Sequence, residues 1–410
     1  MPDSPSTGET APTRARRRVA LRFAPKVAFL AVGALLVPAL AAASLLVVVG
    51  ETRAGRLFGG VSAALLVGLA SGFGAWRAPG RPCWMWGSLG VVAVGVASIL
   101  AVALVRGAVP DRPEGRFGLQ SRFGPESRLP RYAPARLVPE RDQVALMVSL
   151  ATRPIFWSAR SRTIRETTLD LYRSIEADPA ARGLGAVTHL GLLEAVGGDF
   201  RRSEHSFAYV PQPRPGERLG LVVFLHGNGG NFQVLPWAWR GFAEARRFAI
   251  LCPTFGLGFW GEGGVEAVDR SLDDALARWP IDGGRVYLGG ISDGGVGVTR
   301  SARAHPERYR GLIYVSPTMR RDELAAPEFA GAWKGRPILV FQGGRDWSVR
   351  QGTVDPAVGL LRGQGSAVTY TVFPDEDHFL FFSRPTELFG RVGEWMGTFD
   401  GPLALPRPEQ

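Results

Sequence analysis

A serine flanked by glycines is the first sign of chemistry in this sequence. The segment G-I-S-D-G at residues 290–294 follows an apolar stretch typical of a strand and opens a stretch typical of a helix. Glycines beside the serine permit the strained turn that exposes its hydroxyl at the end of a strand. The serine then lies at a helix N-terminus, whose free N–H groups favour a developing negative charge. The spacing predicts Ser292 as a nucleophile for acyl chemistry.

A serine hydroxyl needs a base, and the base needs an acid that orients it. His378 follows the last predicted strand, and Asp346 follows the strand before it. The order Ser, Asp, His along the chain is the one expected for a nucleophile on such a turn. Asp375 and Asp377 also neighbour His378, but carboxylates so close in sequence have an awkward geometry for this role. We therefore expect Asp346 to orient the imidazole.

A second glycine-rich segment, L-H-G-N-G-G at residues 225–230, follows an earlier apolar stretch. Glycines at that place let backbone N–H groups turn toward a reacting carbonyl. We expect an oxyanion hole made by the N–H of Asn228, helped by Gly229, and the N–H of Asp293. His226 is expected to be a structural residue of the turn.

These motifs together resemble the α/β-hydrolase superfamily, over residues 201–400. Within it they are similar to esterases of the dienelactone-hydrolase, feruloyl-esterase and polyhydroxybutyrate-depolymerase type. The resemblance implies a mostly parallel sheet flanked by helices, and hydrolysis of carboxylic esters through an acyl-enzyme. A serine peptidase, or a cell-envelope acyltransferase, would use the same triad and stays open; a non-catalytic scaffold would not need it.

Independently of the resemblance, short apolar strands separated by helices predict a mostly parallel sheet that is buried on both faces. Ligands bind at the carboxyl ends of such strands, where the motifs lie. The predicted strands are Phe207–Val210, Leu221–Leu225, Phe248–Cys252, Arg285–Gly289, Leu312–Val315, Ile338–Phe341 and Val368–Phe373. The predicted helices are Phe232–Arg247, Val265–Trp279, Gly294–Ala304 and Glu387–Thr398.

Aromatic residues near the strand ends predict the substrate class. Phe259, Trp260 and Trp347 are expected to contact an apolar or aromatic group, and no large insertion between the late strands forms a lid. A small-molecule or polymer ester is the expected substrate. The sequence shows no phosphate loop, dinucleotide fingerprint or metal-ligand cluster, so we expect no cofactor and no metal.

Three uncharged runs precede this domain: Val27–Gly50, Leu57–Trp76 and Cys83–Val105. Each reaches the roughly 20 residues that cross a bilayer, so residues 27–106 are expected to form three transmembrane helices, with tight turns at 51–56 and 77–82. The arm at residues 1–26 is rich in arginine and is expected to stay in the cytoplasm. The catalytic domain would then lie on the outer or periplasmic side of a membrane.

Charge and composition bound the remaining possibilities. The net charge is +11, but residues 221–410 contain 20 Lys and Arg against 21 Asp and Glu, so the excess lies upstream. No nucleic-acid-binding motif accompanies it, and two cysteines form no disulfide framework.

Residues 107–140 are expected to be a Pro/Gly/Arg-rich linker. Residues 141–200 are expected to be a helical segment, with helices at Thr163–Glu176 and Ala186–Val196. This segment packs on the catalytic domain, covers its mouth or lies on the bilayer. Residues 401–410 are a tail; the oligomeric state is not predicted.

Overall fold

The computed structural model describes residues 40–77, 92–93, 95, 117–123, 139–151, 159–178 and 205–399. The chain divides into two compact units, Met1–Val102 and Ala103–Gln410. The predicted arm at residues 1–26, the predicted helix Ala186–Val196, the tail and Cys83 lie outside the described residues.

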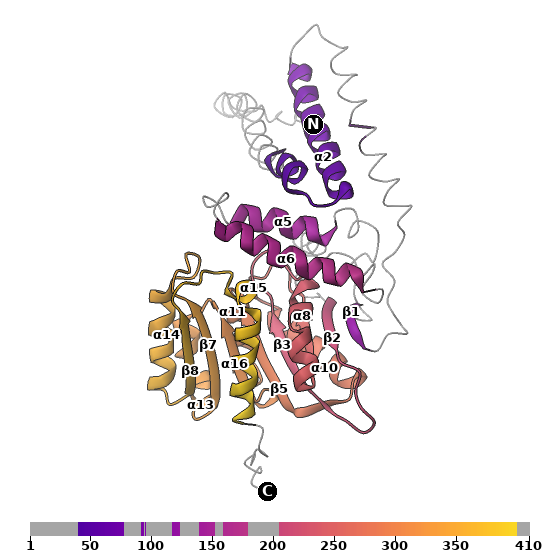
Figure 1. The fold of residues 1–410 in the computed structure, drawn as a ribbon. Helices are drawn as coiled ribbons and strands as arrows, with labels where there is room; N and C mark the ends of the chain where they lie inside the picture. Colours follow the sequence, from indigo (N-terminus) through magenta and orange to yellow (C-terminus); the bar gives the residue numbers. More distant parts are fainter. Residues whose placement is uncertain are drawn as a thin grey trace, which may run out of the picture. The chain divides into compact units, whose positions relative to one another are not determined.

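An eight-stranded sheet forms the centre of the second unit (Figure 1). The strand order is β1-β2-β4-β3-β5-β6-β7-β8. β1 and β2 pair antiparallel, β2 pairs antiparallel with β4, and the strands from β4 to β8 are parallel. The predicted α/β fold with a mostly parallel sheet is confirmed. The strands are β1 (Gly118–Phe123), β2 (His205–Val210), β3 (Leu219–Leu225), β4 (Phe248–Pro253), β5 (Ile281–Ile291), β6 (Gly311–Val315), β7 (Pro337–Gly343) and β8 (Ala367–Phe373).

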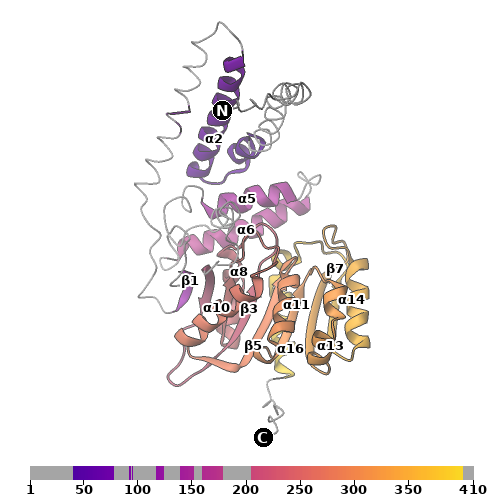
Figure 2. The same ribbon diagram turned by 180° about the vertical axis from the view of Figure 1, so that it is seen from behind.

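Helices cover both faces of the sheet, as Figure 1 and the view from behind in Figure 2 show. Side chains of β3 alternate between the two cores: Val222 belongs to the core that includes residues of α9 and α16, whereas Leu221 belongs to the core that includes residues of α10, α11 and α14. Burial on both faces explains why β3 is apolar at every position but one. The helices are α5 (Glu140–Ala151), α6 (Ala159–Ala177), α8 (Val234–Ala238), α9 (Arg240–Arg246), α10 (Gly264–Arg278), α11 (Gly294–Ala304), α12 (Arg321–Leu324), α13 (Pro327–Ala332), α14 (Gln351–Gly363), α15 (Leu380–Ser383) and α16 (Pro385–Gly397).

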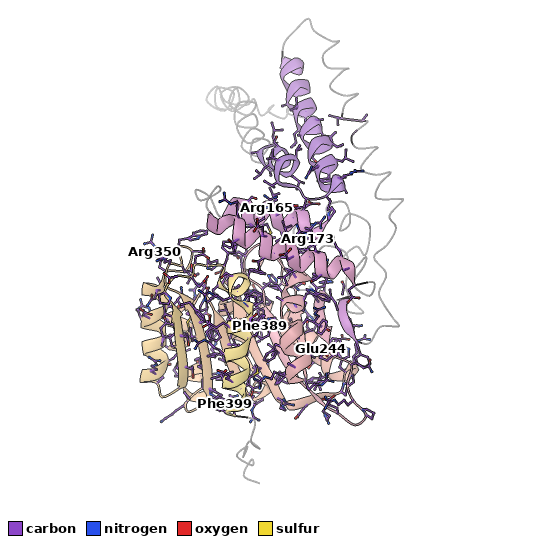
Figure 3. All side chains as sticks on the ribbon, viewed as in Figure 1. Arg165, Arg173, Glu244, Arg350, Phe389 and Phe399 are labelled. Atoms are coloured by element: carbon purple, nitrogen blue, oxygen red, sulfur yellow. The ribbon has the colours of Figure 1, made fainter. Side chains whose placement is uncertain are left out.

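The predicted helix Phe232–Arg247 is two helices, α8 and α9, which meet at Trp239. Trp239 is fully buried, and its ring centroid lies 4.3 Å from that of Phe389 on α16. Phe389 is labelled in Figure 3. Packing of this aromatic pair holds the C-terminal helix against the face that α9 covers.

β1 lies inside the segment expected to be a linker, so that expectation is wrong for Gly118–Phe123. The strand carries polar side chains that are nevertheless buried. Because these residues are polar, the hydropathy of the sequence did not predict a strand here. Ser121 is 2.9 Å from Nε2 of His205 on β2, and Nδ1 of His205 is 2.9 Å from the Thr254 hydroxyl. Burial lowers the pKa of His205 to about 3, so the imidazole is neutral in this network.

The described helices of the segment 141–200 pack on the domain that is built around the sheet. α6 contains the predicted helix Thr163–Glu176 and lies against α8 and α15, and α5 lies against α6. Figure 1 shows both helices above the sheet, and Figure 3 marks Arg165 and Arg173 on α6. The exposed face of α6 carries charges, including an ion pair between Arg173 and Asp170, while Ile164 and Tyr172 face the core.

The first unit contains a helix at Leu40–Val49 and the longer α2 (Arg53–Arg77). α2 includes the predicted run Leu57–Trp76 and is, among the described residues, the one helix long and apolar enough to cross a membrane. It begins at Arg53, so the expected turn at 51–56 is shorter than predicted. A β-carbon on Gly59 would lie 2.8 Å from the carbonyl oxygen of Ala43, so the two helices approach closely there. The run Cys83–Val105 and the first part of Val27–Gly50 lie almost wholly outside the described residues.

Candidate active site

Ser292 occupies a strained turn between β5 and α11. Its φ is 55°, in the left-handed region that non-glycine residues rarely adopt. The turn is packed so tightly that a β-carbon on Gly294 would lie 2.3 Å from the carbonyl oxygen of Leu225, and one on Gly290 would lie 2.7 Å from the Gly294 carbonyl carbon. Glycine is therefore required at both positions, and the strained turn presents the serine hydroxyl outward.

His378 meets the hydroxyl of Ser292 from the loop that follows β8. Its Nε2 is 3.0 Å from the serine Oγ, and its Nδ1 is 2.9 Å from Oδ2 of Asp346. When Nδ1 carries the ring proton and donates a hydrogen bond to the carboxylate, Nε2 has a free lone pair and can accept the serine proton. The structure thus brings together the three side chains that the sequence singled out.

Asp346 is held as an acceptor by its own loop after β7. The carboxylate is fully buried, and its Oδ1 accepts hydrogen bonds from the N–H groups of Ser348 (2.9 Å) and Val349 (2.8 Å). Those donors fix the carboxylate and satisfy the oxygen that does not face His378. The alternative carboxylates are engaged elsewhere: Asp375 pairs with Arg345 at the surface, and Asp377 accepts the N–H of Phe379.

The turn after β3 lies directly against the serine. A β-carbon on Gly227 would be 2.9 Å from Cβ of Ser292, so only glycine fits beside the nucleophile. The N–H of Gly229 donates to the carbonyl oxygen of Leu257 at 2.9 Å. Gly229 therefore cannot supply the oxyanion donor that the sequence suggested, because that N–H is already used. Among the described residues, no hydrogen bond is donated by the N–H of Asn228 or of Asp293, and these two remain the candidate donors.

His226 stabilises the turn from within. Its Nδ1 donates to the carbonyl oxygen of Gly227 at 2.8 Å, and its Nε2 accepts the N–H of Phe255 at 3.1 Å. Burial lowers the pKa of His226 to about 4, so the ring stays neutral and suits one donor and one acceptor. This arrangement places His226 as the structural residue that the sequence predicted.

Trp260 is the clearest departure from the predicted substrate contacts. It is fully buried, and its indole N–H donates to the carbonyl oxygen of His226 at 2.8 Å. Its ring stacks on Phe255, with centroids 5.6 Å apart. Trp260 therefore supports the turn from inside the core, and the prediction that it contacts substrate is wrong in this structure.

Phe259 and Trp347 are placed differently, because both are exposed at the rim of the site. Phe259 is 66% exposed and Trp347 is 47% exposed. The Trp347 ring centroid lies 6.3 Å from that of His378, and Phe259 follows Gly258, whose β-carbon would touch the carbonyl of Gly227. Exposed aromatic side chains beside Ser292 are suited to contact an apolar group of a bound molecule.

Three residues near the site escaped the sequence reasoning. Thr318 donates its N–H to the carbonyl oxygen of Ser292 and its hydroxyl to Oδ1 of Asp293. Glu376, two residues before His378 in the chain, is buried and accepts hydrogen bonds from Ser383 and Arg384. Thr318 follows a strand at the same edge as the triad, and that position is the one signal that could have indicated it.

The third is Glu140 at the start of α5. Its Oε1 accepts the hydroxyl of Tyr172 at 2.7 Å and the N–H of Gln233 at 2.8 Å. Burial raises the pKa of Glu140 to about 8, against the lowering effect of those two hydrogen bonds. Nothing in the sequence indicates this, because the partners are 32 and 93 residues away.

Solved structures similar to this chain include esterases and serine hydrolases of the α/β-hydrolase fold. A thermostable esterase is 22% identical, with a TM-score of 0.41 over 47% of this chain and 58% of its own length. The fluorophosphonate-binding serine hydrolase F of Staphylococcus aureus is 13% identical, with a TM-score of 0.41 over 47% of this chain and 91% of its own. Est1E from Butyrivibrio proteoclasticus is 15% identical, with a TM-score of 0.39 over 47% and 94%.

This chain thus spans less than two thirds of the length of the thermostable esterase. No family model matches the sequence, and no curated protein matches it. The activity of this chain is inferred from the geometry of its own residues.

Proposed function

We propose that this protein is a serine hydrolase that cleaves carboxylic esters through an acyl-enzyme. The observation that carries the proposal is the continuous hydrogen-bonded path from Ser292 through His378 to the buried carboxylate of Asp346. A nucleophile, a base and an orienting acid in this geometry are the parts that acyl transfer needs.

In the first half of the reaction, Oγ of Ser292 attacks the ester carbonyl carbon while Nε2 of His378 accepts the hydroxyl proton. The carbonyl oxygen becomes an oxyanion, which the N–H groups of Asn228 and Asp293 stabilise. Asp346 holds the imidazole in the required tautomer and stabilises the imidazolium. When the bond to the alcohol breaks, His378 gives its proton to the leaving oxygen.

In the second half, water attacks the acyl group on Ser292. His378 accepts a proton from that water and returns it to the serine oxygen as the acid departs. Exposed Phe259 and Trp347 favour a substrate with an apolar group.

Labelling by a fluorophosphonate probe tests the nucleophile. We expect the full-length protein to be labelled, and Ser292→Ala to lose both labelling and hydrolysis of p-nitrophenyl esters. Ser271→Ala on α10 is the matched control and should behave as the wild type. Labelling that persists in Ser292→Ala would refute the proposal.

A substrate screen tests the reaction class. We expect p-nitrophenyl esters to be cleaved faster than aminoacyl amides of the same acyl group. Faster amide cleavage would favour a peptidase, and acyl transfer to an added alcohol in preference to water would favour an acyltransferase.

We also propose that the first unit anchors the enzyme in a membrane, with the catalytic unit on the outer side. The length and composition of α2 and the uncharged runs of the sequence support the anchor, and the arginine-rich arm supports the orientation. The protein should remain in the membrane pellet after alkaline extraction, and protease added to intact cells should cleave the catalytic unit. Release into the supernatant would contradict the anchor; protection in intact cells, with cleavage after lysis, would contradict the orientation.

A further inference from the structure

The side chain of Met147 on α5 lies against the turn beside the serine. A β-carbon on Gly229 would be 2.2 Å from Cε of Met147 and 3.4 Å from its sulfur, and apart from Gly229 and its two chain neighbours no other described residue has an atom within 4 Å of that position. The closeness means that the thioether methyl packs directly on the glycine backbone. α5 therefore forms a wall next to the turn that carries Asn228.

Met147 sits at the edge of the buried face of α5. Val144 and Val148, four residues apart, share the side of the helix that is buried in the core. Met147, three residues after Val144, borders that side and is half-buried. Part of the Met147 side chain is thus exposed, while its buried neighbours anchor the helix.

Polar contacts fix this wall in place. Glu140, two turns earlier on α5, accepts the N–H of Gln233, which belongs to the segment leading from the turn into α8. On α6, the hydroxyl of Ser174 accepts the indole N–H of Trp237 at 2.6 Å. Because buried polar contacts of this kind are directional, they hold the two helices at a defined place on the catalytic domain.

The wall is close enough to meet a bound substrate. Gly227 touches Ser292, and two consecutive Cα–Cα steps place Gly229 at most about 7.6 Å from Gly227. The leaving alcohol must face His378, which donates its proton, and Trp347 lies on that side. The acyl group lies on the other side of the ester carbon, so an acyl chain that follows the turn past Asn228 would reach Met147.

We propose that Met147 is a specificity-determining residue that limits the length of the acyl group. The proposal rests on the proposed esterase function and adds the source of its acyl preference. The pocket side formed by Met147 accommodates short acyl groups, and longer ones meet the thioether. A flexible methionine fills such a boundary without a polar atom that would need a partner.

Two ester series test the proposal on the purified full-length protein. The first is p-nitrophenyl acetate, butyrate and octanoate, in which only the acyl group changes. Met147→Ala should raise the ratio of kcat/KM for octanoate to that for acetate by about tenfold, because single methylenes change discrimination by roughly 10- to 200-fold. Met147→Trp should lower the ratio by about tenfold. Met147→Leu, which has a side chain of similar volume, should keep the ratio near the wild-type value.

The second series consists of acetate esters of alcohols of increasing size. The Met147 variants should leave its kcat/KM ratios within about twofold of the wild type. A change confined to the alcohol series, or no change in either series, would overturn the proposal.

Leu171→Ala on α6 is the matched control. Leu171 is half-buried against the same core but does not reach the position beside Gly229. It should reproduce any general loosening of the helix pair without the acyl-length shift. An equal shift in Leu171→Ala would assign the effect to loosening and refute a direct role of Met147.

Failure of this inference is distinguishable from failure of the esterase function. Residual hydrolysis in Ser292→Ala would remove the esterase assignment itself. Full dependence on Ser292 with unchanged acyl ratios would leave the esterase in place and refute the role of Met147.

Discussion

The hydroxyl of Thr318 donates a 2.5 Å hydrogen bond to Oδ1 of Asp293, the residue that follows the serine. The N–H of the same threonine donates to the carbonyl oxygen of Ser292. Thr318 comes from the loop after β6, so a neighbouring strand holds both residues of the turn. The orientation of the Asp293 N–H, a candidate oxyanion donor, depends on this contact.

Replacement of Thr318 by valine should impair catalysis without unfolding the protein. The variant keeps the backbone bond to Ser292 but loses the hydroxyl bond to the carboxylate of Asp293. Hydrogen bonds to charged groups contribute about 1.5–3 kcal/mol, so we expect kcat/KM for p-nitrophenyl acetate to fall about tenfold. Thr318→Ser should restore the activity, and Thr353→Val on α14 should have no effect. Equal activity of Thr318→Val and the wild type would show that the hydroxyl does not position the turn.

Replacement of Asp346 by asparagine should lower kcat by about 10³–10⁴-fold, because the amide favours the wrong tautomer of His378. Asp375→Asn and Asp377→Asn are the controls and should each retain activity within a few-fold. A larger loss in either control than in Asp346→Asn would reassign the orienting carboxylate. The measurement is steady-state kinetics, with thermal unfolding to verify the fold.

Replacement of Gly227 by alanine should lower kcat about 10²–10³-fold, the loss expected when an oxyanion site is distorted. The added methyl would lie 2.9 Å from Cβ of Ser292, so either the serine or the turn must move. Gly241→Ala on α9 is the matched control, because its β-carbon meets no atom within 4 Å. That change should leave kcat intact and slightly stabilise the helix. Normal activity in Gly227→Ala would mean that the turn can move away freely.

The stability of the catalytic unit should depend on pH through Glu140. Its pKa is raised by burial from 4.5 to about 8, so folding favours the protonated form. The resulting stability is fully present below pH 4.5 and is lost as the pH rises toward and through 8. Glu140→Gln resembles the protonated side chain and should flatten this loss in thermal unfolding between pH 5 and 8. Glu176→Gln, at a half-exposed ion pair with Arg141, is the control and should retain the wild-type slope. A wild-type slope in Glu140→Gln would contradict the assignment.

The sequence predicted the parts of the site that local pattern determines. The turn at Ser292 needs glycines at fixed offsets, and His378 and Asp346 follow apolar strands. Each of the three residues can therefore be recognised from the few residues that surround it in the sequence. All seven predicted strands are present as β2 to β8. Most of those strands are buried on both faces of the sheet, so their sequences are continuously apolar, and that pattern identified them.

What the sequence could not predict depends on partners far away in the chain. The N–H of Gly229 is used by Leu257 from another loop, and Trp260 is buried beneath the turn when an exposed aromatic was expected. β1 escaped because its buried Gln120 and Ser121 are polar, and Ser121 is satisfied by His205, 84 residues later. In each case the deciding contact forms only after the chain has folded.

β1 also determines where the catalytic unit can be cut. It covers one edge of β2, whose other edge pairs with β4. A truncation that starts at residue 201, where the motifs begin, would leave that edge open, and an uncovered strand recruits other chains. Such a fragment should aggregate or form edge-to-edge oligomers, whereas one that starts upstream of Phe117 should remain dispersed. With β1 in place, the edge of the sheet is a short strand of polar side chains, which we expect to pair with other chains less readily than β2 would.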